Sequence, residues 1–180
     1  MQFIILDIEA TCWNDSFSPY PQETIELGAC KLSMYGKLLS KFSELIIPRN
    51  NPILSQYCRN LTGISQKEID QAKNFNTVMS KFEDWVFEDS DQNYYFAWGS
   101  KDKKILADDN VNHRGDNYWI EEIQDLKKQY NDIKAYNKVL GFDKVLELEN
   151  IEFEGNKHRA LPDAFNLSKV FVKYIDSWQY

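Results

Sequence analysis

Two acidic residues near the start of the chain, Asp7 and Glu9, follow an apolar run and stand two positions apart. If this run is a strand, both carboxylates leave the same face, while Leu6 and Ile8 point into apolar packing on the other. Like charges this close in a partly dry site are costly unless one is protonated or a cation lies between them. Mg²⁺ suits such a pair because it prefers oxygen ligands. A solvated strand face is the alternative.

A histidine and an aspartate form a second candidate pair, in the segment HRALPD from His158 to Asp163. On one regular helix, five steps of about 100° would leave their side chains roughly 140° apart. Proline is favoured at the first helical position, so we predict that Pro162 starts a helix, with Asp163 in its first turn and His158 in the loop before it. His158 is then free to turn toward the same metal centre, although a lone histidine can equally have a structural role.

A third acidic candidate, Asp102, closes the segment WGSKD, where a strand is predicted to end and a helix to begin. Carboxylates of active sites favour such strand ends, because the loop can be shaped while the sheet holds it. Asp108 and Asp109 lie two turns further into the predicted helix, where surface or helix-end roles are expected. We therefore prefer Asp102 to Asp108 and Asp109 as the third acidic residue of the site.

Hydrophobic periodicity predicts the elements that must position these residues. Strands are predicted for residues 2–9, 23–35, 38–47, 94–98 and 119–126. A capping box of Ser65 and Glu68 predicts the start of one helix, and an apolar stripe over residues 75–86 predicts an amphipathic helix. Further helices are predicted for residues 53–61, 102–107, 134–140, 143–149 and 161–178. This order indicates a single α/β domain over residues 1–180, with a mixed five-stranded sheet flanked by helices.

The acidic segments also resemble a known family. LDIEATCW, WGSKD and HRALPDAFNLSKV, in this order, are similar to the three exonuclease motifs of the DnaQ-like, DEDD-type superfamily in its histidine-bearing branch. ETIELGACKL and FSELIIPRNNPILSQYCRNLTGISQKEID resemble the Eri-type, histone-mRNA 3′ exonuclease subfamily. The resemblance runs from about residue 2 to about residue 174 and implies an RNase H-like fold.

The resemblance assigns roles to the motif residues. It implies that two Mg²⁺ or Mn²⁺ ions are held by Asp7, Glu9, Asp102 and Asp163, and that His158 is the general base. By extension, the terminal nucleotide is expected to contact Thr11, Cys12, Trp13, Leu61 and Trp98. Lys101 departs from the family, because an aromatic residue often stands beside the second-motif aspartate.

The net charge of −7 argues against a protein that coats long nucleic acid through a broad basic face. An enzyme that holds only a few terminal nucleotides needs just a local basic rim, for which the candidates are Lys101, Lys103, Lys104, Lys157 and Arg159. No basic flank precedes the first apolar run, and three cysteines without C-x-x-C spacing suggest neither disulfides nor zinc. We expect a cytoplasmic protein that does not cross a membrane.

These observations predict a metal-dependent 3′-5′ exonuclease that acts on single-stranded nucleic acid, with RNA preferred, and releases nucleoside 5′-monophosphates. Single-stranded DNA or very short oligonucleotides are alternative substrates. A non-catalytic module that binds 3′ ends or a protein partner is the alternative from another class. Such a module would be expected to have lost a carboxylate or the histidine, and all five are present. The physiological substrate, oligomeric state and protein partners are left open.

Overall fold

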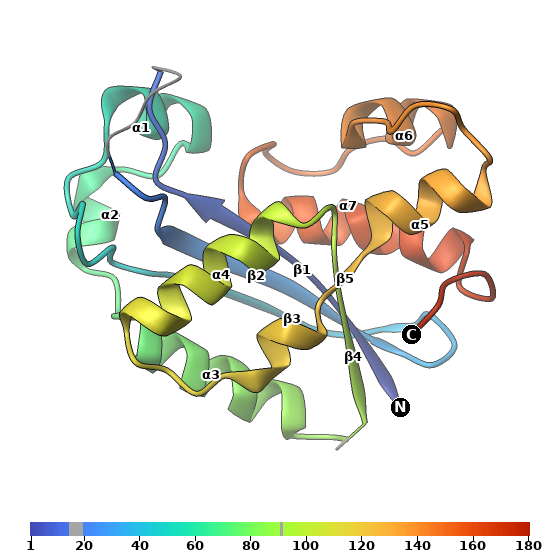
Figure 1. The fold of residues 1–180 in the computed structure, drawn as a ribbon, viewed down its shortest axis with the longest axis horizontal. Coiled ribbons are helices and arrows are strands. Elements are labelled where there is room, and N and C mark those ends of the chain that lie inside the picture. Colours follow the sequence, from blue (N-terminus) through green and yellow to red (C-terminus); the bar gives the residue numbers. More distant parts are fainter. Residues whose placement is uncertain (15–19, 91) are drawn as a thin grey trace.

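A five-stranded mixed sheet forms the centre of the computed structural model, which describes residues 1–14, 20–90 and 92–180 (Figure 1). Its strands are β1 (Gln2–Ala10), β2 (Thr24–Ser33), β3 (Leu38–Leu45), β4 (Asn93–Ala97) and β5 (Gln124–Asp125), in the order β3-β2-β1-β4-β5. The pairs β1–β2 and β2–β3 are antiparallel, whereas β1–β4 and β4–β5 are parallel. The predicted α/β class and five-stranded mixed sheet are confirmed.

Helices cover both faces of the sheet. They are α1 (Gln56–Thr62), α2 (Gln66–Asp70), α3 (Phe75–Phe87), α4 (Lys101–Asn112), the 3₁₀ helix η1 (Tyr118–Glu122), α5 (Leu126–Ile133), α6 (Phe142–Leu148) and α7 (Ala160–Lys173). Buried residues of α3, α4 and η1 share one core cluster with the sheet, and buried residues of α5, α6 and α7 share another. None of the helices among the described residues is long and apolar enough to span a lipid bilayer.

Strand β1 separates these two cores by strict alternation. Ile4, Leu6 and Ile8 belong to the core under α3 and α4, and Phe3 and Ile5 belong to the core under α5, α6 and α7. Because side chains alternate along a strand, the next residues on the second face are the two carboxylates of the first motif. The prediction that these acids leave one face, opposite buried apolar residues, is confirmed.

The region before α5 differs from the prediction. A strand was expected over residues 119–126, but Trp119 and Ile120 are buried from the 3₁₀ turn, and only two residues pair with β4. Trp119 packs against Phe82 of α3, with ring centroids 4.7 Å apart, which explains apolar residues outside a strand. The helix expected over 134–140 instead spans Leu126–Ile133, and Asp125 caps it by accepting a hydrogen bond from the backbone N–H of Lys128 at 3.0 Å.

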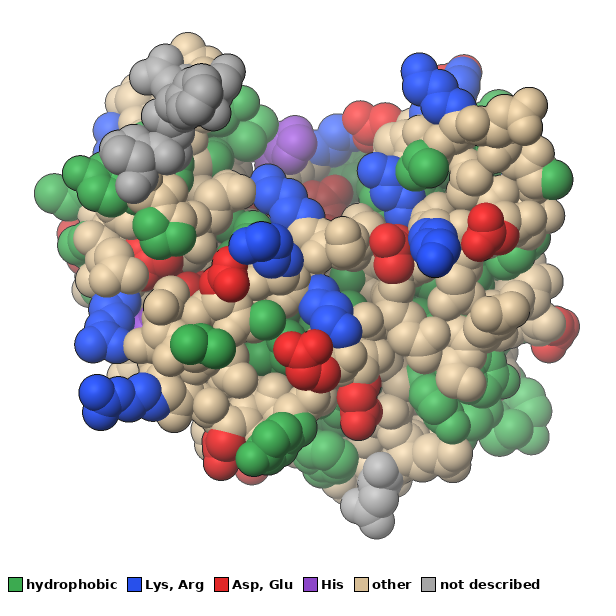
Figure 2. All heavy atoms as spheres, in the orientation of Figure 1, with side chains coloured by type: hydrophobic (Ala, Val, Ile, Leu, Met, Phe, Trp, Pro, Cys, Tyr) green, Lys and Arg blue, Asp and Glu red, His purple; other side chains and the backbone are tan. Residues whose placement is uncertain are grey.

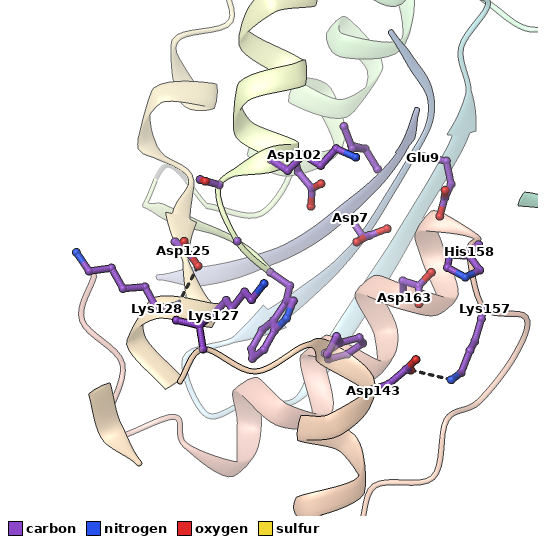
Figure 3. Close-up of a pocket in the computed structure, with 17 residues that line it drawn as sticks. Asp7, Glu9, Asp102, Asp125, Lys127, Lys128, Asp143, Lys157, His158 and Asp163 are labelled. Carbon is purple, nitrogen blue, oxygen red and sulfur yellow. Dashed lines mark hydrogen bonds and ion pairs between the residues drawn. The ribbon is translucent and has the colours of Figure 1, made fainter. Parts of the chain in front are cut away.

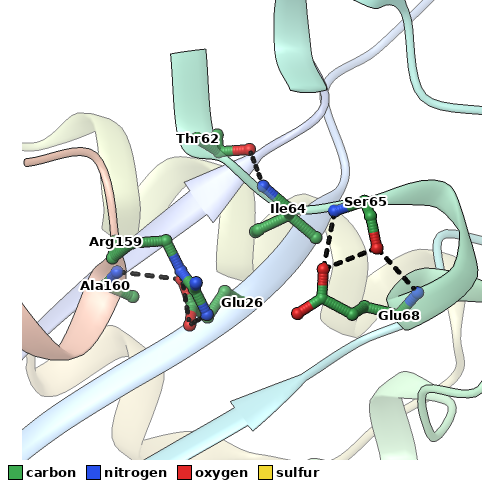
Figure 4. Close-up of polar contacts among 7 residues, drawn as sticks. All are labelled: Glu26, Thr62, Ile64, Ser65, Glu68, Arg159 and Ala160. Carbon is green, nitrogen blue, oxygen red and sulfur yellow. Dashed lines mark hydrogen bonds and ion pairs between the residues drawn. The ribbon is translucent and has the colours of Figure 1, made fainter. Parts of the chain in front are cut away.

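The last helix is shorter than predicted at one end. It was expected to reach residue 178 but ends at Lys173. Beyond it the chain turns back, since the indole N–H of Trp178 donates to the carbonyl oxygen of Phe171 at 2.8 Å and the two rings stack. The predicted capping box is confirmed, because Ser65 and Glu68 bond each other reciprocally at the start of α2 (Figure 4).

Candidate active site

A cleft of about 680 Å³ opens at the carboxyl ends of β1 and β4. Asp7 and Glu9 enter it from β1, Asp102 from the first turn of α4, and Asp163 from the first turn of α7 (Figure 3). Carboxylate oxygens of Asp7, Glu9 and Asp163 lie within 4.8 Å of one another. Three segments far apart in the sequence thus bring four carboxylates into one cleft.

Asp102 reaches the cluster because β1 and β4 run parallel, so their carboxyl ends meet at the same edge of the sheet. The two rival aspartates do not line this cleft. Asp108 is half-exposed and pairs with Lys104 at 2.6 Å. Asp109 is buried on the other side of α4 and accepts a hydrogen bond from the backbone N–H of Thr24 at 2.7 Å.

Burial raises the pKa of every carboxyl in the cluster, and repulsion within the cluster adds to this for Asp7, Glu9 and Asp102. Burial is the larger cause for Asp7, whose pKa lies well above its usual value, followed by the charges of Asp102 and Asp163. The same causes raise the pKa of Glu9 to about 8. Burial raises the pKa of Asp102 to about 7 and that of Asp163 to about 6. Without a cation, the cluster therefore retains protons near neutral pH.

This donor set fits a hard divalent cation. It consists of carboxylate oxygens alone, held close together in a half-buried cleft. A cation bound between them would replace the retained protons and remove the repulsion that raises their pKa values. A dry structural site would instead be expected to pair each carboxylate with a basic side chain, and no ion pair to Asp7, Glu9, Asp102 or Asp163 is found in the described part of the chain.

His158 lies beside the carboxylates at the mouth of the cleft, between Glu9 and Asp163 (Figure 3). It is exposed, lies in the loop before α7 as predicted, and has a positive φ of 60°. That backbone conformation is unfavourable for a residue with a Cβ and costs on the order of 1–3 kcal/mol. Pro162 is the third residue of α7 rather than the first, which the helix tolerates because the first-turn N–H groups have no partners within the helix.

A buried clamp fixes the segment that carries His158. The guanidinium of Arg159 donates to the carboxylate of Glu26 on β2 at 2.8 and 3.0 Å, and the backbone N–H of Ala160 donates to the same carboxylate at 3.0 Å (Figure 4). Two residues along β2, Gly28 lies so close to α7 that a Cβ there would be 2.2 Å from the nitrogen of Leu161. Strand β2 thus places the first turn of α7, and with it the carboxylate and the histidine of the third motif.

Sequence reasoning missed this clamp. Glu26 and Gly28 were not singled out, although an acidic residue inside the otherwise apolar stretch of β2 was a usable signal. Arg159 was assigned to a basic rim, but its guanidinium is engaged by Glu26. That assignment is wrong, because a buried carboxylate on β2 needs this cation as its partner.

The rest of the predicted basic rim is only partly present. Lys101 and Lys157 line the cleft, and Lys157 pairs with Asp143 of α6 at 2.7 Å. The other two lysines lie outside its lining, since Lys103 pairs with Glu121 and Lys104 with Asp108. The cleft gains two lysines that were not predicted, Lys127 and Lys128, because the helix that carries them was placed too late in the sequence. Figure 2 shows basic side chains gathered around the hollow between the α1 and α6 sides.

Of the predicted substrate-binding residues, Trp98 lines the cleft, where its ring packs against Phe142 and Tyr130. The other four do not line it: Thr11, Cys12, Trp13 and Leu61. The hydroxyl of Thr11 is buried and accepts a hydrogen bond from the backbone N–H of Glu23 at 2.9 Å. A role for these four in substrate binding stays a prediction.

Comparisons with known proteins identify related sequences. The family model described as Exonuclease (RNase_T) matches residues 4–171. ERI1 exoribonuclease 2 of Homo sapiens is 29% identical over 96% of this chain and 28% of its own length, and the 3′-5′ exonuclease Snipper of Drosophila melanogaster is 27% identical over 96% of this chain and 68% of its own length. The chain spans less than a third of the ERI1 exoribonuclease 2 proteins it matches.

Solved structures show the same fold. The nuclease domain of 3′hExo, a DEDDh family member bound to rAMP, superposes with a TM-score of 0.87 at 24% identity, over 97% of this chain and 92% of that one. The expected RNase H-like exonuclease fold is thereby confirmed.

Proposed function

Because this chain belongs to the exonuclease family, we propose that it is a metal-dependent 3′-5′ exonuclease that hydrolyses single-stranded RNA from the 3′ end. One observation carries the proposal. Four carboxylates and His158, from three remote segments, meet in one open cleft whose carboxyl groups have raised pKa values. Raised pKa values in an open cleft are typical of functional sites. A purely structural acidic cluster would gain nothing from such repulsion.

The carboxylates Asp7, Glu9, Asp102 and Asp163 are proposed to hold two Mg²⁺ ions, for which Mn²⁺ can substitute. Such ions, when bound, neutralise the phosphate charge and lower the pKa of a bound water. The sheet and the first turns of α4 and α7 preorganise these ligands, since all four sit on regular elements and not on long loops.

His158 is proposed to act as the general base. Its ring lies at the mouth of the cleft, open to solvent and next to the carboxylates, where a ring nitrogen can accept a proton from the attacking water. The water oxygen then bonds to the terminal phosphorus while the bond from that phosphorus to the 3′ oxygen of the preceding nucleotide breaks. The 3′ oxygen leaves with the bonding electron pair and takes up a proton from solvent, so the products are a nucleoside 5′-monophosphate and a chain shorter by one residue with a free 3′ hydroxyl.

RNA is proposed as the substrate because the relatives include proteins named exoribonucleases, and one related structure was solved with rAMP bound.

Cys12, Cys30 and Cys58 are free thiols, which supports a reducing compartment such as the cytoplasm as the location. Fractionation of cells that express a tagged chain would test that location, and recovery in an oxidising compartment would contradict it.

The activity is tested with 5′-labelled single-stranded RNA, single-stranded DNA and a duplex with a 3′ overhang, each incubated with Mg²⁺ or with EDTA. We expect a ladder that shortens from the 3′ end of the RNA, only with Mg²⁺. Equal cleavage in EDTA would contradict the proposed metal dependence. Faster cleavage of DNA than of RNA would contradict RNA as the preferred substrate. The absence of cleavage in all three would refute the proposed activity.

A further inference from the structure

Two lysines on one wall of the cleft have no acidic partner. Lys127 and Lys128 both line it from the first turn of α5. Of the four lysines that line the cleft, Lys157 is neutralised by Asp143, and Lys101 on α4 has no ion pair among the described residues. Among the described residues, likewise, no carboxylate lies within ion-pairing distance of Lys127 or Lys128. The nearby carboxylate of Asp125 is used as the helix cap.

The place of these lysines in α5 is unfavourable for the helix itself. The first turn of a helix carries partial positive charge from unpaired N–H groups, so two cations there are repelled, and α5 has no acidic residue in that turn. The cap carboxylate of Asp125 offsets only part of this repulsion, because two lysines follow it in the first turn. Unfavourable placements of this kind are expected where a ligand compensates for them, and here that ligand would be an anion.

The two side chains take different directions. The chain of Lys127 extends into the cleft, toward the side where Asp7 lies, whereas Lys128 extends away from the carboxylates (Figure 3). Lys127 is half-buried and its stem passes Gly99, where a Cβ would lie 3.7 Å from its Cδ. The positive φ of 98° at Gly99 turns the chain between β4 and α4, beside this stem. Lys127 thus lies on the inner side of this wall and Lys128 on its outer side.

We propose that Lys127 binds the phosphate next to the scissile one on its 5′ side, and that Lys128 binds the phosphate after that. This proposal rests on the proposed exonuclease function and adds a substrate class, because it requires an oligonucleotide with at least two phosphates beyond the scissile bond for full activity. It also explains how a chain with net charge −7 can hold a polyanion, since the cations needed are concentrated on one wall.

The experiment measures kcat/KM on a series of oligoadenylates with a free 5′ hydroxyl, from the dimer to the hexamer. The dimer contains only the scissile phosphate. For the wild-type chain we expect about a tenfold rise from dimer to trimer and a smaller rise from trimer to tetramer, typical of charge-assisted contacts. Lys127→Ala removes the first rise, so that dimer and trimer have similar kcat/KM, and Lys128→Ala removes the second. Lys127→Arg retains most of the first rise, since the charge is kept.

Lys138→Ala is the matched control, because Lys138 follows α5 in the sequence, is exposed, does not line the cleft and has no ion pair among the described residues. With the hexamer, the salt dependence should also become shallower by about 0.7 in log–log slope for each lost contact, and not for the control. A flat length profile in the wild-type chain, or a Lys127→Ala variant that slows dimer and trimer equally, would overturn the proposal. No hydrolysis of any length would instead refute the exonuclease function itself.

Discussion

Neutralising one carboxylate of the cluster should make the metal-free protein more stable, and the size of the gain should depend on pH. Asp102 is the clearest case, because burial raises its pKa from 3.8 to about 7. An acid whose pKa is raised in the folded state holds its proton more tightly there than in the unfolded chain. The stability that this carboxyl contributes is therefore fully present below about pH 4, and it is lost as the pH rises to about 7.

The magnitude follows from the shift. About three pKa units correspond to about 4 kcal/mol, and the remaining repulsion among the other carboxylates reduces what one substitution can recover, so we expect about 2–4 kcal/mol. The Asp102→Asn variant has no ionisable group at this position, so it does not lose this stability as the pH rises. For a domain of this size, the melting temperature changes by roughly 3 °C per kcal/mol, so the variant should melt about 6–12 °C above the wild-type chain at pH 8 in EDTA.

The assay is thermal unfolding in EDTA between pH 4 and pH 8, followed by circular dichroism. The two melting temperatures should coincide near pH 4 and diverge up to about pH 7. Mg²⁺ should raise the melting temperature of the wild-type chain more than that of the variant. Asp108→Asn is the control, since Asp108 lies on the same helix, is exposed and is outside the cleft. Parallel pH profiles for wild type and Asp102→Asn would refute the reasoning.

Four further outcomes are expected. Asp7→Asn should abolish hydrolysis while circular dichroism shows the fold intact, since the substitution relieves repulsion. His158→Ala should reduce kcat by about 10² to 10⁴, the usual range for a general base, with metal binding by calorimetry unchanged. Gly28→Ala should lower both the melting temperature and the activity, because a Cβ 2.2 Å from Leu161 displaces the start of α7. Anisotropy of labelled RNA on Asp7→Asn should show weaker binding in EDTA than in Mg²⁺.

The histidine and glycine substitutions have matched controls in the same chain. His113, the only other histidine, stacks on Phe75 and does not line the cleft, so His113→Ala should retain activity. Gly141→Ala tests a glycine with open space around it and a negative φ, and should be tolerated. A wild-type rate in Asp7→Asn or His158→Ala would remove that residue from the mechanism. Full stability of Gly28→Ala would show that β2 and α7 can separate without loss.

The acidic cluster was predictable from the sequence because each member follows a local rule. Asp7 continues the alternation of a buried strand, Asp102 follows a strand end, and Asp163 stands in the first turn of a helix near a proline. The fold that unites them, however, was implied by family resemblance. Periodicity alone gives the elements and not the parallel pairing of β1 with β4, which depends on contacts between distant segments.

The errors lie where packing overrides periodicity. Residues 119–126 were predicted as a strand, but Trp119 fills space against α3, and a helix begins directly after Asp125, which caps it. Because that helix was predicted too late in the sequence, Lys127 was not recognised as a residue of the cleft. The Glu26 clamp was hidden for a related reason, since a partner 133 residues away leaves no periodic signal in the sequence.

The charges of the cleft predict that divalent cations favour binding of the polyanion. Six carboxylates and four lysines line it, so a metal-free cleft with its acids ionised is negative and repels phosphate. Two divalent cations would reverse that excess, and the unpaired lysines would then add to a positive field along the α5 wall. The raised pKa values have the same origin, because burial and the neighbouring carboxylates disfavour the ionised form of Glu9 and Asp102. Metal and nucleic acid should therefore bind cooperatively, each increasing the affinity of the other by the same factor, since the coupling between two bound ligands is reciprocal.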